Sequence, residues 1–249
     1  MTALIRVGTS GWSYPHWRET VYPADCPPAR WLEWYAGQLD TVELNASFYR
    51  LPQPATFAGW RRRTPAAFLW AVKASRYLTH VRRLADPAEP LARLYQAVDE
   101  LGEKLGPILC QLPPSLVFAE QLLVDFCQAL DGRRRHALEV RHPSWLGALA
   151  RKIMADHNLA LCIADAAGRY PYHEELTADF VYLRLHGAES LYGSLYREEQ
   201  LAAWAGKLAA WGRPGYVYFD NDAQGHAFAN ARRLAELVAG PLTDPGGSP

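Results

Sequence analysis

The sequence is poor in the features that mark secreted, metal-binding or nucleotide-binding proteins. It has four cysteines in 249 residues, with no Cys-x-x-Cys pair and no Cys/His ligand spacing: Cys26, Cys110, Cys127 and Cys162. We therefore expect reduced thiols in a cytosolic protein rather than disulfides or a zinc site. No Gly-x-Gly-x-x-Gly or P-loop pattern occurs, and Gly8-x-x-Gly11 is no dinucleotide fingerprint, so neither kind of phosphate loop is expected.

Net charge and long apolar runs are also missing. Lysine and arginine together number 26, as do aspartate and glutamate, so no overall charge attracts the protein to nucleic acid or to a membrane. No apolar run approaches the roughly 20 residues of a membrane-spanning helix. A predicted strand begins at Ile5, which leaves no room for a signal peptide. We expect a cytoplasmic protein with no membrane partner.

No internal linker divides the chain. Residues 1–239 are predicted to form one domain. Residues 240–249 (GPLTDPGGSP) are of low complexity and have almost nothing to bury, so we expect a disordered tail.

A strand-like alternation recurs along the chain and ends each time in polar residues. In residues 180–187, Tyr182, Arg184 and His186 alternate with apolar residues before Gly187, and the side-chain period of two puts all three on one face. Seven further segments follow this pattern: residues 5–11, 41–45, 69–73, 108–112, 137–141, 161–165 and 217–222. The sequence therefore predicts eight strands.

Helical patterns fill the intervals between these strands. Apolar residues at helical spacing occur in residues 90–104, 120–130, 145–157, 198–211 and 227–238. An open parallel sheet would also alternate in this way. Eight strand–helix units in 249 residues favour an α/β fold of one closed (β/α)8 TIM barrel.

Ionisable residues at the strand ends are the candidate functional residues. The carboxyl ends of all strands of such a barrel meet at one mouth, which is where its chemistry is normally located. The phase predicts that one set of polar residues converges there: Glu43, Asn45, Lys73, Gln111, Glu139, Arg141, Asp165, Arg184 and His186.

The residue types suggest how the chemistry could be divided. Arg141 and Arg184 can clamp a phosphate or carboxylate with paired donors, and Lys73 adds a point charge, a base or an imine-forming amine. Glu43 or Glu139 could serve as general base, with His186 as the acid. Asp165 is the third acid of the set. This inventory suits an isomerase, a lyase or a hydrolase acting on a small anionic molecule.

Three other interpretations remain open. The three acids could simply neutralise the three cations as a salt-bridge plug, Glu43, Glu139 and Asp165 against Lys73, Arg141 and Arg184. The same acids with His186 could hold a metal ion, as in metal-dependent phosphodiesterase or endonuclease barrels, but the three cations would repel it, so no metal or other cofactor is expected. Finally, the protein could bind a small anion or nucleic acid without catalysis.

The position of two basic runs tests whether the protein binds nucleic acid. Residues 61–63 and 133–135 are both Arg-Arg-Arg and lie at or beyond the ends of predicted helices, where solvated cations are ordinary. If they face the mouth, they favour nucleic acid; if they face the opposite end, they do not.

An aromatic stretch follows the first predicted strand. Residues 12–17 (WSYPHW) are more typical of a hydrophobic lid over the barrel than of a stacking wall for a ligand, with Trp12 as the exception nearest a ligand. Thr9 reads as a turn and hydrogen-bonding residue rather than a nucleophile. Thr9, Trp12, Asn45, Gln111 and Asn221, with the two arginines, are the candidate substrate-binding residues.

Seven motifs in order give the chain a family resemblance. They are Gly8-Thr9-Ser10-Gly11-Trp12, Glu43-Leu44-Asn45 with Phe48-Tyr49, Lys73, Gln111-Leu112-Pro113-Pro114, Glu139-Val140-Arg141-His142 with Ser144-Trp145, Arg184-Leu185-His186-Gly187, and Tyr218-Phe219-Asp220-Asn221 with Gly225 and Asn230. Across nearly the whole chain this set resembles the DUF72 (YecE-like) family, which implies a TIM barrel but no established reaction. Asp220-Asn221 stands where paired asparagines are expected, which adds a potential acid.

Overall fold

A computed structural model describes residues 3–240, and its strands form two parallel sheets. The four-stranded sheet has the order β1 (Ile5–Thr9), β9 (Gly215–Phe219), β8 (Val181–Leu185) and β7 (Ile163–Asp165). The five-stranded sheet has the order β2 (Thr41–Leu44), β3 (Leu69–Lys73), β4 (Leu105–Gln111), β5 (His136–Glu139) and β6 (Ala160–Leu161). The predicted α/β class with parallel strands is thereby confirmed.

The two sheets adjoin at both of their edges. On one side only Cys162 separates β6 from β7, so one extended segment passes from the first sheet to the second. On the other side a Cβ atom added at Gly8 of β1 would overlap the carbonyl oxygen of Thr41 in β2. The Tyr35 hydroxyl bridges this seam, accepting from the Thr9 N–H and donating to the Thr41 carbonyl, both at 3.0 Å.

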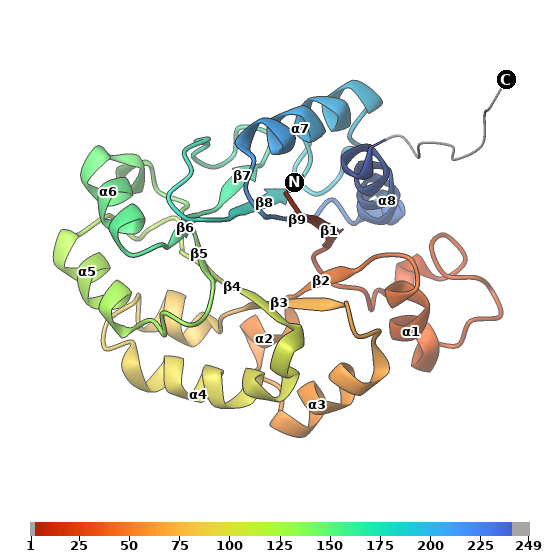
Figure 1. Cartoon of the computed structure of the whole chain (residues 1–249), viewed down its shortest axis with the longest axis horizontal. Coiled ribbons are helices and arrows are strands. Elements are labelled where there is room, and N and C mark those ends of the chain that lie inside the picture. The colour runs from red at the N-terminus through yellow and green to blue at the C-terminus, as the bar shows by residue number, and fades with distance from the viewer. Residues whose placement is uncertain (1–2, 241–249) are drawn as a thin grey trace, which may run out of the picture.

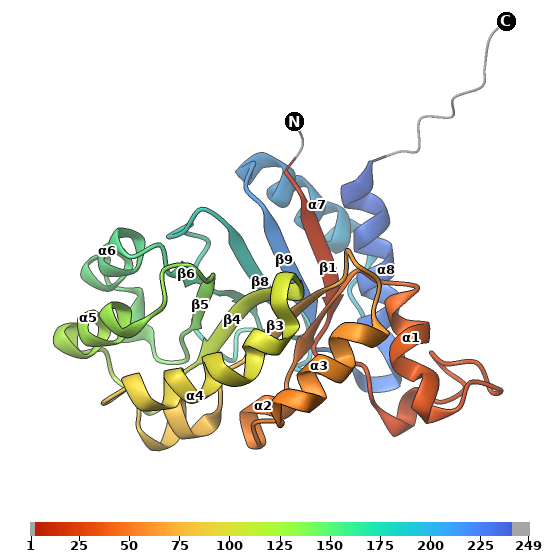
Figure 2. The same cartoon turned by 60° about the horizontal axis from the view of Figure 1, so that its bottom comes forward.

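Helices lie around the outside of the strands (Figures 1 and 2). Their bounds are α1 (Trp31–Ala36), α2 (Ala46–Tyr49), α3 (Pro54–Arg63), α4 (Ala88–Val98), α5 (Glu120–Ala129), α6 (Ala148–Asp156), α7 (Glu198–Trp211) and α8 (His226–Ala239). No helix among residues 3–240 is long and apolar enough to cross a membrane. The four cysteines are unpaired.

Glycines explain where the helices depart from prediction. The predicted helix 145–157 is split because Gly147 is extended (φ −64°, ψ 151°), leaving a 3-10 turn at Pro143–Leu146 before α6. The predicted helix 90–104 ends as α-helix at Val98 and continues as a 3-10 segment, in which Gly102 has φ 55°. Helix α7 occupies the predicted range and ends at Gly212, whose left-handed conformation suits a glycine.

Two apolar clusters show which way the strand residues point. The larger cluster contains Val42, Val72, Leu138 and Leu183, together with residues of the surrounding helices. The smaller one gathers side chains of both sheets that face each other, among them Ala71, Leu109, Ala137, Tyr182 and Tyr218. Alanines of the five-stranded sheet thus lie in the same cluster as tyrosines of the four-stranded one, so residues two positions further along each strand also point inward.

All residues of the predicted tail, 240–249, except Gly240 lie outside the described residues.

Candidate functional site

A polar layer follows the inward-facing apolar cluster at the carboxyl ends of the strands. Its members come two residues after apolar members of that cluster: Lys73 after Ala71, Gln111 after Leu109, Glu139 after Ala137, Arg184 after Tyr182 and Asp220 after Tyr218. Glu43 follows Thr41 in the same phase, and the Thr41 hydroxyl contacts that of Tyr218 at 2.8 Å. The period of two therefore assembles these groups at one end of the fold, which we call the mouth.

Arg184 is the centre of this layer. Its side chain is 1% exposed, and its guanidinium donates to Glu43 Oε1 (2.9 Å), Glu139 Oε2 (2.8 Å) and Asp220 Oδ2 (3.1 Å). Burial disfavours the charged guanidinium, but these carboxylates outweigh it and hold the pKa of Arg184 well above its ordinary value. As an anion clamp Arg184 would have to release these partners.

Glu43 has no exposed surface and is bound from three sides. Ser10 Oγ donates to its Oε1 at 2.8 Å, and the Tyr182 hydroxyl donates to its Oε2 at 2.6 Å, besides the contact with Arg184. A buried carboxylate so fully paired holds its neighbours in place. The groups around Arg184 therefore neutralise one another, as in the salt-bridge plug considered from the sequence.

His186 lies between two carboxylates. Its Nδ1 is 2.9 Å from Asp220 Oδ2 and its Nε2 is 3.3 Å from Glu139 Oε1, within ion-pair range but without good hydrogen-bond angles. Burial raises the pKa of Glu139, but the charges of Arg141 and Arg184 outweigh that effect and hold it well below the ordinary value. For Asp220 burial is likewise outweighed, mainly by Arg184, and its pKa is lowered.

Lys73 differs from the two arginines of the layer. Its side chain is buried, Nζ donates to Gln111 Oε1 at 2.8 Å, and it lies 4.5 Å from the centre of the Phe48 ring. No carboxylate of residues 3–240 lies within 4 Å of it. Burial, aided by the charge of Arg184, lowers the pKa of Lys73 to about 8.

A cavity of about 510 Å³ opens above the polar layer and is called the mouth cavity below. Its lining includes Trp12, Tyr14, Asn45, Tyr49, Lys73, Gln111, Arg184, Tyr192 and Asp220. Asn45 donates through Nδ2 to the Ser10 carbonyl at 3.1 Å, while its buried Oδ1 has no partner among the described residues. The cavity thus offers donors at Lys73 and acceptors at Asn45 and Asp220.

Asp165 does not belong to this layer, and its predicted convergence with the others is wrong. It pairs in register with Leu185, which packs in the helix-facing core, while Ala164 pairs with Arg184. The side chain of Asp165 therefore points outward, where its Oδ2 accepts from the Tyr196 hydroxyl at 2.9 Å.

Two predicted substrate-binding residues also point away from the mouth cavity. Thr9 is buried and bonded to Tyr35 and to the Gly11 carbonyl. Asn221 is buried and donates to the Ser194 carbonyl (2.8 Å) and to Asn230 Oδ1 (3.0 Å). Each is adjacent in sequence to a residue whose side chain does face the polar layer, Ser10 beside Thr9 and Asp220 beside Asn221. The sequence analysis gave Ser10 no role in the site and left the role of Asp220 open.

Arg141 and Trp12 have mainly structural contacts. Arg141 Nη2 lies 2.5 Å from Glu139 Oε1, and its guanidinium stacks 3.7 Å from the centre of the Tyr170 ring, although its Nε has no partner among the described residues. Trp12, which the sequence set apart from the predicted lid as the residue nearest a ligand, lines the mouth cavity and also packs edge-on against Trp60 and Trp70.

The two arginine runs lie at the end of the fold opposite the mouth. Arg61 and Arg63 close α3 ahead of β3 and pair with Glu103 and Glu33. Residues 133–135 directly precede β5, where Arg133 and Arg134 pair with Asp131. By the criterion set from the sequence, this position does not favour nucleic acid at the mouth.

The carboxylates of the polar layer are not arranged as a metal centre. Within the part of the chain that the structure describes, no group of three or more His, Cys, Asp or Glu side chains is placed to hold a metal ion. Arg184 lies among the carboxylates that such an ion would need, and its charge opposes a cation there.

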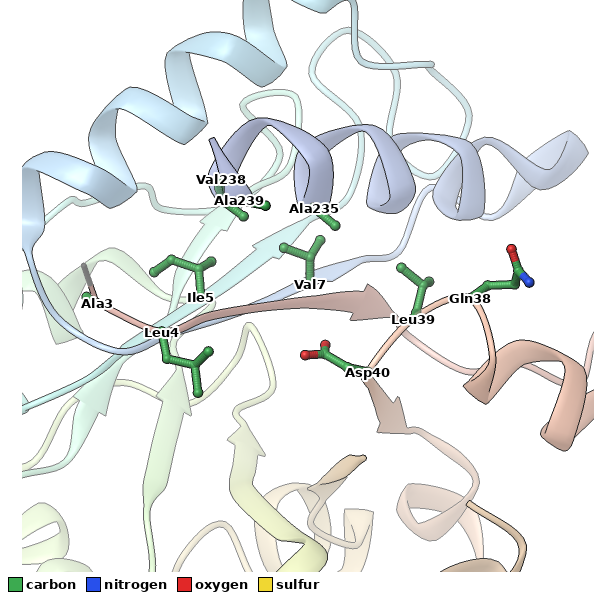
Figure 3. Close-up of a pocket in the computed structure, with 10 residues that line it drawn as sticks. All are labelled: Ala3, Leu4, Ile5, Val7, Gln38, Leu39, Asp40, Ala235, Val238 and Ala239. Carbon is green, nitrogen blue, oxygen red and sulfur yellow. The ribbon is translucent and has the colours of Figure 1, made fainter. Parts of the chain in front are cut away.

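A further cavity, of about 480 Å³, lies at the opposite end of β1 (Figure 3). It is lined mostly by apolar residues, such as Val7, Leu39 and Val238, and its one ionisable group is Asp40. Asp40 is already paired with Arg6 at 2.7 Å. This cavity offers no set of reactive groups.

Comparison with known proteins places the chain among proteins without an assigned reaction. The family model described as "Protein of unknown function DUF72" matches residues 6–247. UPF0759 protein YecE of Escherichia coli (strain K12) is 24% identical over 233 residues, covering 84% of this chain and 82% of its own. UPF0759 protein YunF of Bacillus subtilis (strain 168) is 23% identical over 270 residues, covering 94% and 95%.

Solved structures of similar proteins share the architecture. A DUF72 family protein of Thermotoga maritima MSB8 superposes with a TM-score of 0.83 at 28% identity, covering 95% of this chain and 99% of its own. One from Enterococcus faecalis V583 reaches 0.80 at 19% identity, with coverage of 95% and 96%, which shows a common fold alone.

Proposed function

The chain belongs to the DUF72 family of proteins of unknown function, and we propose that it is an enzyme acting on a small phosphate- or carboxylate-bearing substrate by proton transfer in the mouth cavity. The observation that carries this proposal is Lys73. A buried ammonium without a carboxylate contact is costly, and an anionic substrate would supply the missing partner.

Lys73 and Gln111 form the anion-binding pair. Gln111 accepts from Lys73 through Oε1, which leaves its amide nitrogen as a second donor lining the same cavity. The unpaired Oδ1 of Asn45 accepts a hydrogen bond from a substrate hydroxyl or amine. Together these groups fix the orientation of a small polar molecule.

Asp220 is the general base of the proposed reaction. It lines the mouth cavity, and His186 lies 2.9 Å from its Oδ2. The charge of Arg184 lowers its pKa, so Asp220 is ionised and free of a proton near neutral pH, although the same charge weakens it as a base. Glu43 and Glu139, the bases suggested by the sequence, have no exposed surface and act as positioning residues for Arg184 and His186. The same groups serve an isomerase, a lyase or a hydrolase.

We also propose that the two sheets together form one eight-stranded barrel. The segment of β6 and β7 counts as one strand, and the Tyr35 hydroxyl takes the place of a backbone ladder between β1 and β2. All strands would then direct their carboxyl ends to the mouth, as in TIM-barrel enzymes.

Proton transfer can be tested before the substrate is known. The protein is incubated in D2O with a panel of small phosphate and carboxylate compounds, and NMR monitors deuterium entering carbon positions of each compound. Enzyme-dependent exchange that Lys73→Met and Asp220→Asn both abolish supports the proposal. Lys152→Met, at an exposed lysine of α6, is the matched control.

A separate binding test uses thermal melts with phosphate and citrate. Both anions should raise the melting temperature of the wild type and of Lys152→Met, but not that of Lys73→Met. An equal rise in all three proteins, or none in the wild type, would remove the anion-binding basis of the proposal.

A further inference from the structure

A third cavity lies on the outer side of β7, beside α7, and is called the side cavity. It has a volume of about 430 Å³. Its lining includes Asp165, Tyr170, Tyr172, Tyr196, Gln200, Trp204 and Lys207. The proposed reaction uses none of these residues.

Asp165 is the acidic group among the residues that line this cavity. Its Oδ2 accepts a hydrogen bond from the Tyr196 hydroxyl at 2.9 Å, and the Ala167 backbone N–H also hydrogen-bonds this carboxylate. That hydroxyl in turn accepts from the Gly187 N–H at 3.1 Å, so the position of Tyr196 is fixed. Burial raises the pKa of Asp165 and outweighs the opposing hydrogen bonds from Tyr196 and Ala167 and the more distant charges of His186 and Lys207.

Aromatic rings form the remaining walls. Tyr170, Tyr172, Tyr196 and Trp204 line the cavity, and Tyr172 is 45% exposed at its rim. The ammonium of Lys207 already lies 4.5 Å from the centre of the Trp204 ring, which shows that this wall accommodates a cation. Aromatic rings and a carboxylate that line one cavity are suited to a positively charged ligand rather than to an anion.

The local charges agree with this reading. Lys207 is matched by Glu174, whose Oε1 lies 2.5 Å from its Nζ. Asp165 has no such partner, so one negative charge of the side cavity is left without a cation in contact. From this geometry we infer that the side cavity binds a small organic ammonium ion, with its charge against Asp165 and its carbon atoms against the tyrosine and tryptophan rings.

The side cavity is distinct from the mouth cavity. The linings of the two cavities have no residue in common. The inference therefore does not rest on the proposed reaction, and substitutions at Lys73 should leave ammonium binding unchanged.

Calorimetric titration with choline and with propylammonium tests the inference. At least one should bind saturably, and 3,3-dimethylbutan-1-ol, an uncharged compound shaped like choline, should bind far more weakly. Asp165→Asn should reduce the affinity about ten- to a hundredfold, because a hydrogen-bonded or close charge is lost. Tyr172→Leu, at an exposed position, should reduce it roughly two- to thirtyfold.

Two control variants separate this site from general effects. Glu199→Gln removes an exposed acid of α7, the helix beside the side cavity, and Lys73→Met alters the mouth cavity. Both variants should bind the ammonium ion as the wild type does. The inference is overturned if neither ammonium binds, if the alcohol binds equally well, or if Asp165→Asn and Tyr172→Leu, shown by circular dichroism to be folded, retain wild-type affinity.

Discussion

Arg184 and Glu43 form an ion pair with no appreciable contact with solvent, at 2.9 Å between Nη2 and Oε1. Burying two charges costs several kcal/mol for each ion unless both are fully paired. The pair is satisfied here because Glu139, Asp220, Ser10 and Tyr182 complete its hydrogen bonds. It supports the floor of the mouth cavity, and it limits what Arg184 can do for a ligand.

Replacement of Arg184 by alanine should destabilise the protein strongly. Arg184→Ala leaves Glu43 buried without its cationic partner and Glu139 with Arg141 alone, and breaking a buried pair in this way costs about 3–5 kcal/mol. Urea denaturation should show this loss in the free energy of unfolding, while Arg93→Ala, at an exposed ion pair, should change it little. A near-wild-type value for Arg184→Ala would mean that the plug is not structural.

Glu139 should contribute to stability in a pH-dependent way. Its folded pKa lies well below the ordinary value of 4.5, so the unfolded state binds the proton more readily. The contribution is therefore complete above about pH 4.5 and is lost as the pH falls toward the folded pKa. Thermal melts of Glu139→Gln between pH 3 and 7 should show a melting temperature that falls less steeply with decreasing pH than that of the wild type. An equally steep fall in both proteins would contradict the pairing of Glu139.

Tyr35 should stabilise the seam between β1 and β2. Tyr35→Phe removes the hydroxyl that serves both Thr9 N–H and the Thr41 carbonyl, leaving buried backbone groups without partners. We expect a loss of about 1–3 kcal/mol in the free energy of unfolding. Tyr49→Phe, at a ring that is 77% exposed, is the matched control, and an equal effect of both substitutions would exclude a special role for the seam.

Lys73 should titrate near pH 8. Reductive methylation with ¹³C-formaldehyde and NMR titration should reveal one dimethyl-lysine signal with this pKa, absent from Lys73→Arg. A bound anion should raise that pKa, because a neighbouring negative charge favours the protonated amine. A titration midpoint at the ordinary 10.5 would indicate that Lys73 is solvated or paired.

Asp220 should be required for proton transfer. Asp220→Asn retains the shape of the side chain while removing the base, so solvent exchange into the substrate should fall by at least about a hundredfold. Asp222→Asn, two residues further along, is the control and should retain full exchange. If both variants exchange at the wild-type rate, Asp220 is not the base.

Most strands and the polar layer could be predicted from the sequence because period-two alternation carries the information. Where polar residues alternate with apolar ones, as at Glu43, Glu139 and Arg184, the inward face is unambiguous. The segment around Asp165 is an apolar run, in which either face could be the inner one, so its phase was assigned incorrectly. Counting in twos from Tyr218 would have pointed to Asp220 rather than Asn221.

By itself, then, the sequence determined the α/β class, the parallel strands, the family and the end of the fold at which its charges gather. Only the tertiary structure decided which charges neutralise one another, because pairing depends on distances between strands that are far apart in the chain. Glu43 and Arg184 are separated by 141 residues yet touch, and that contact leaves Lys73 without a carboxylate partner in the mouth cavity. The tertiary structure also decided that Asp165 lies among the aromatic residues of the side cavity, because the two faces of a strand pack against different neighbours.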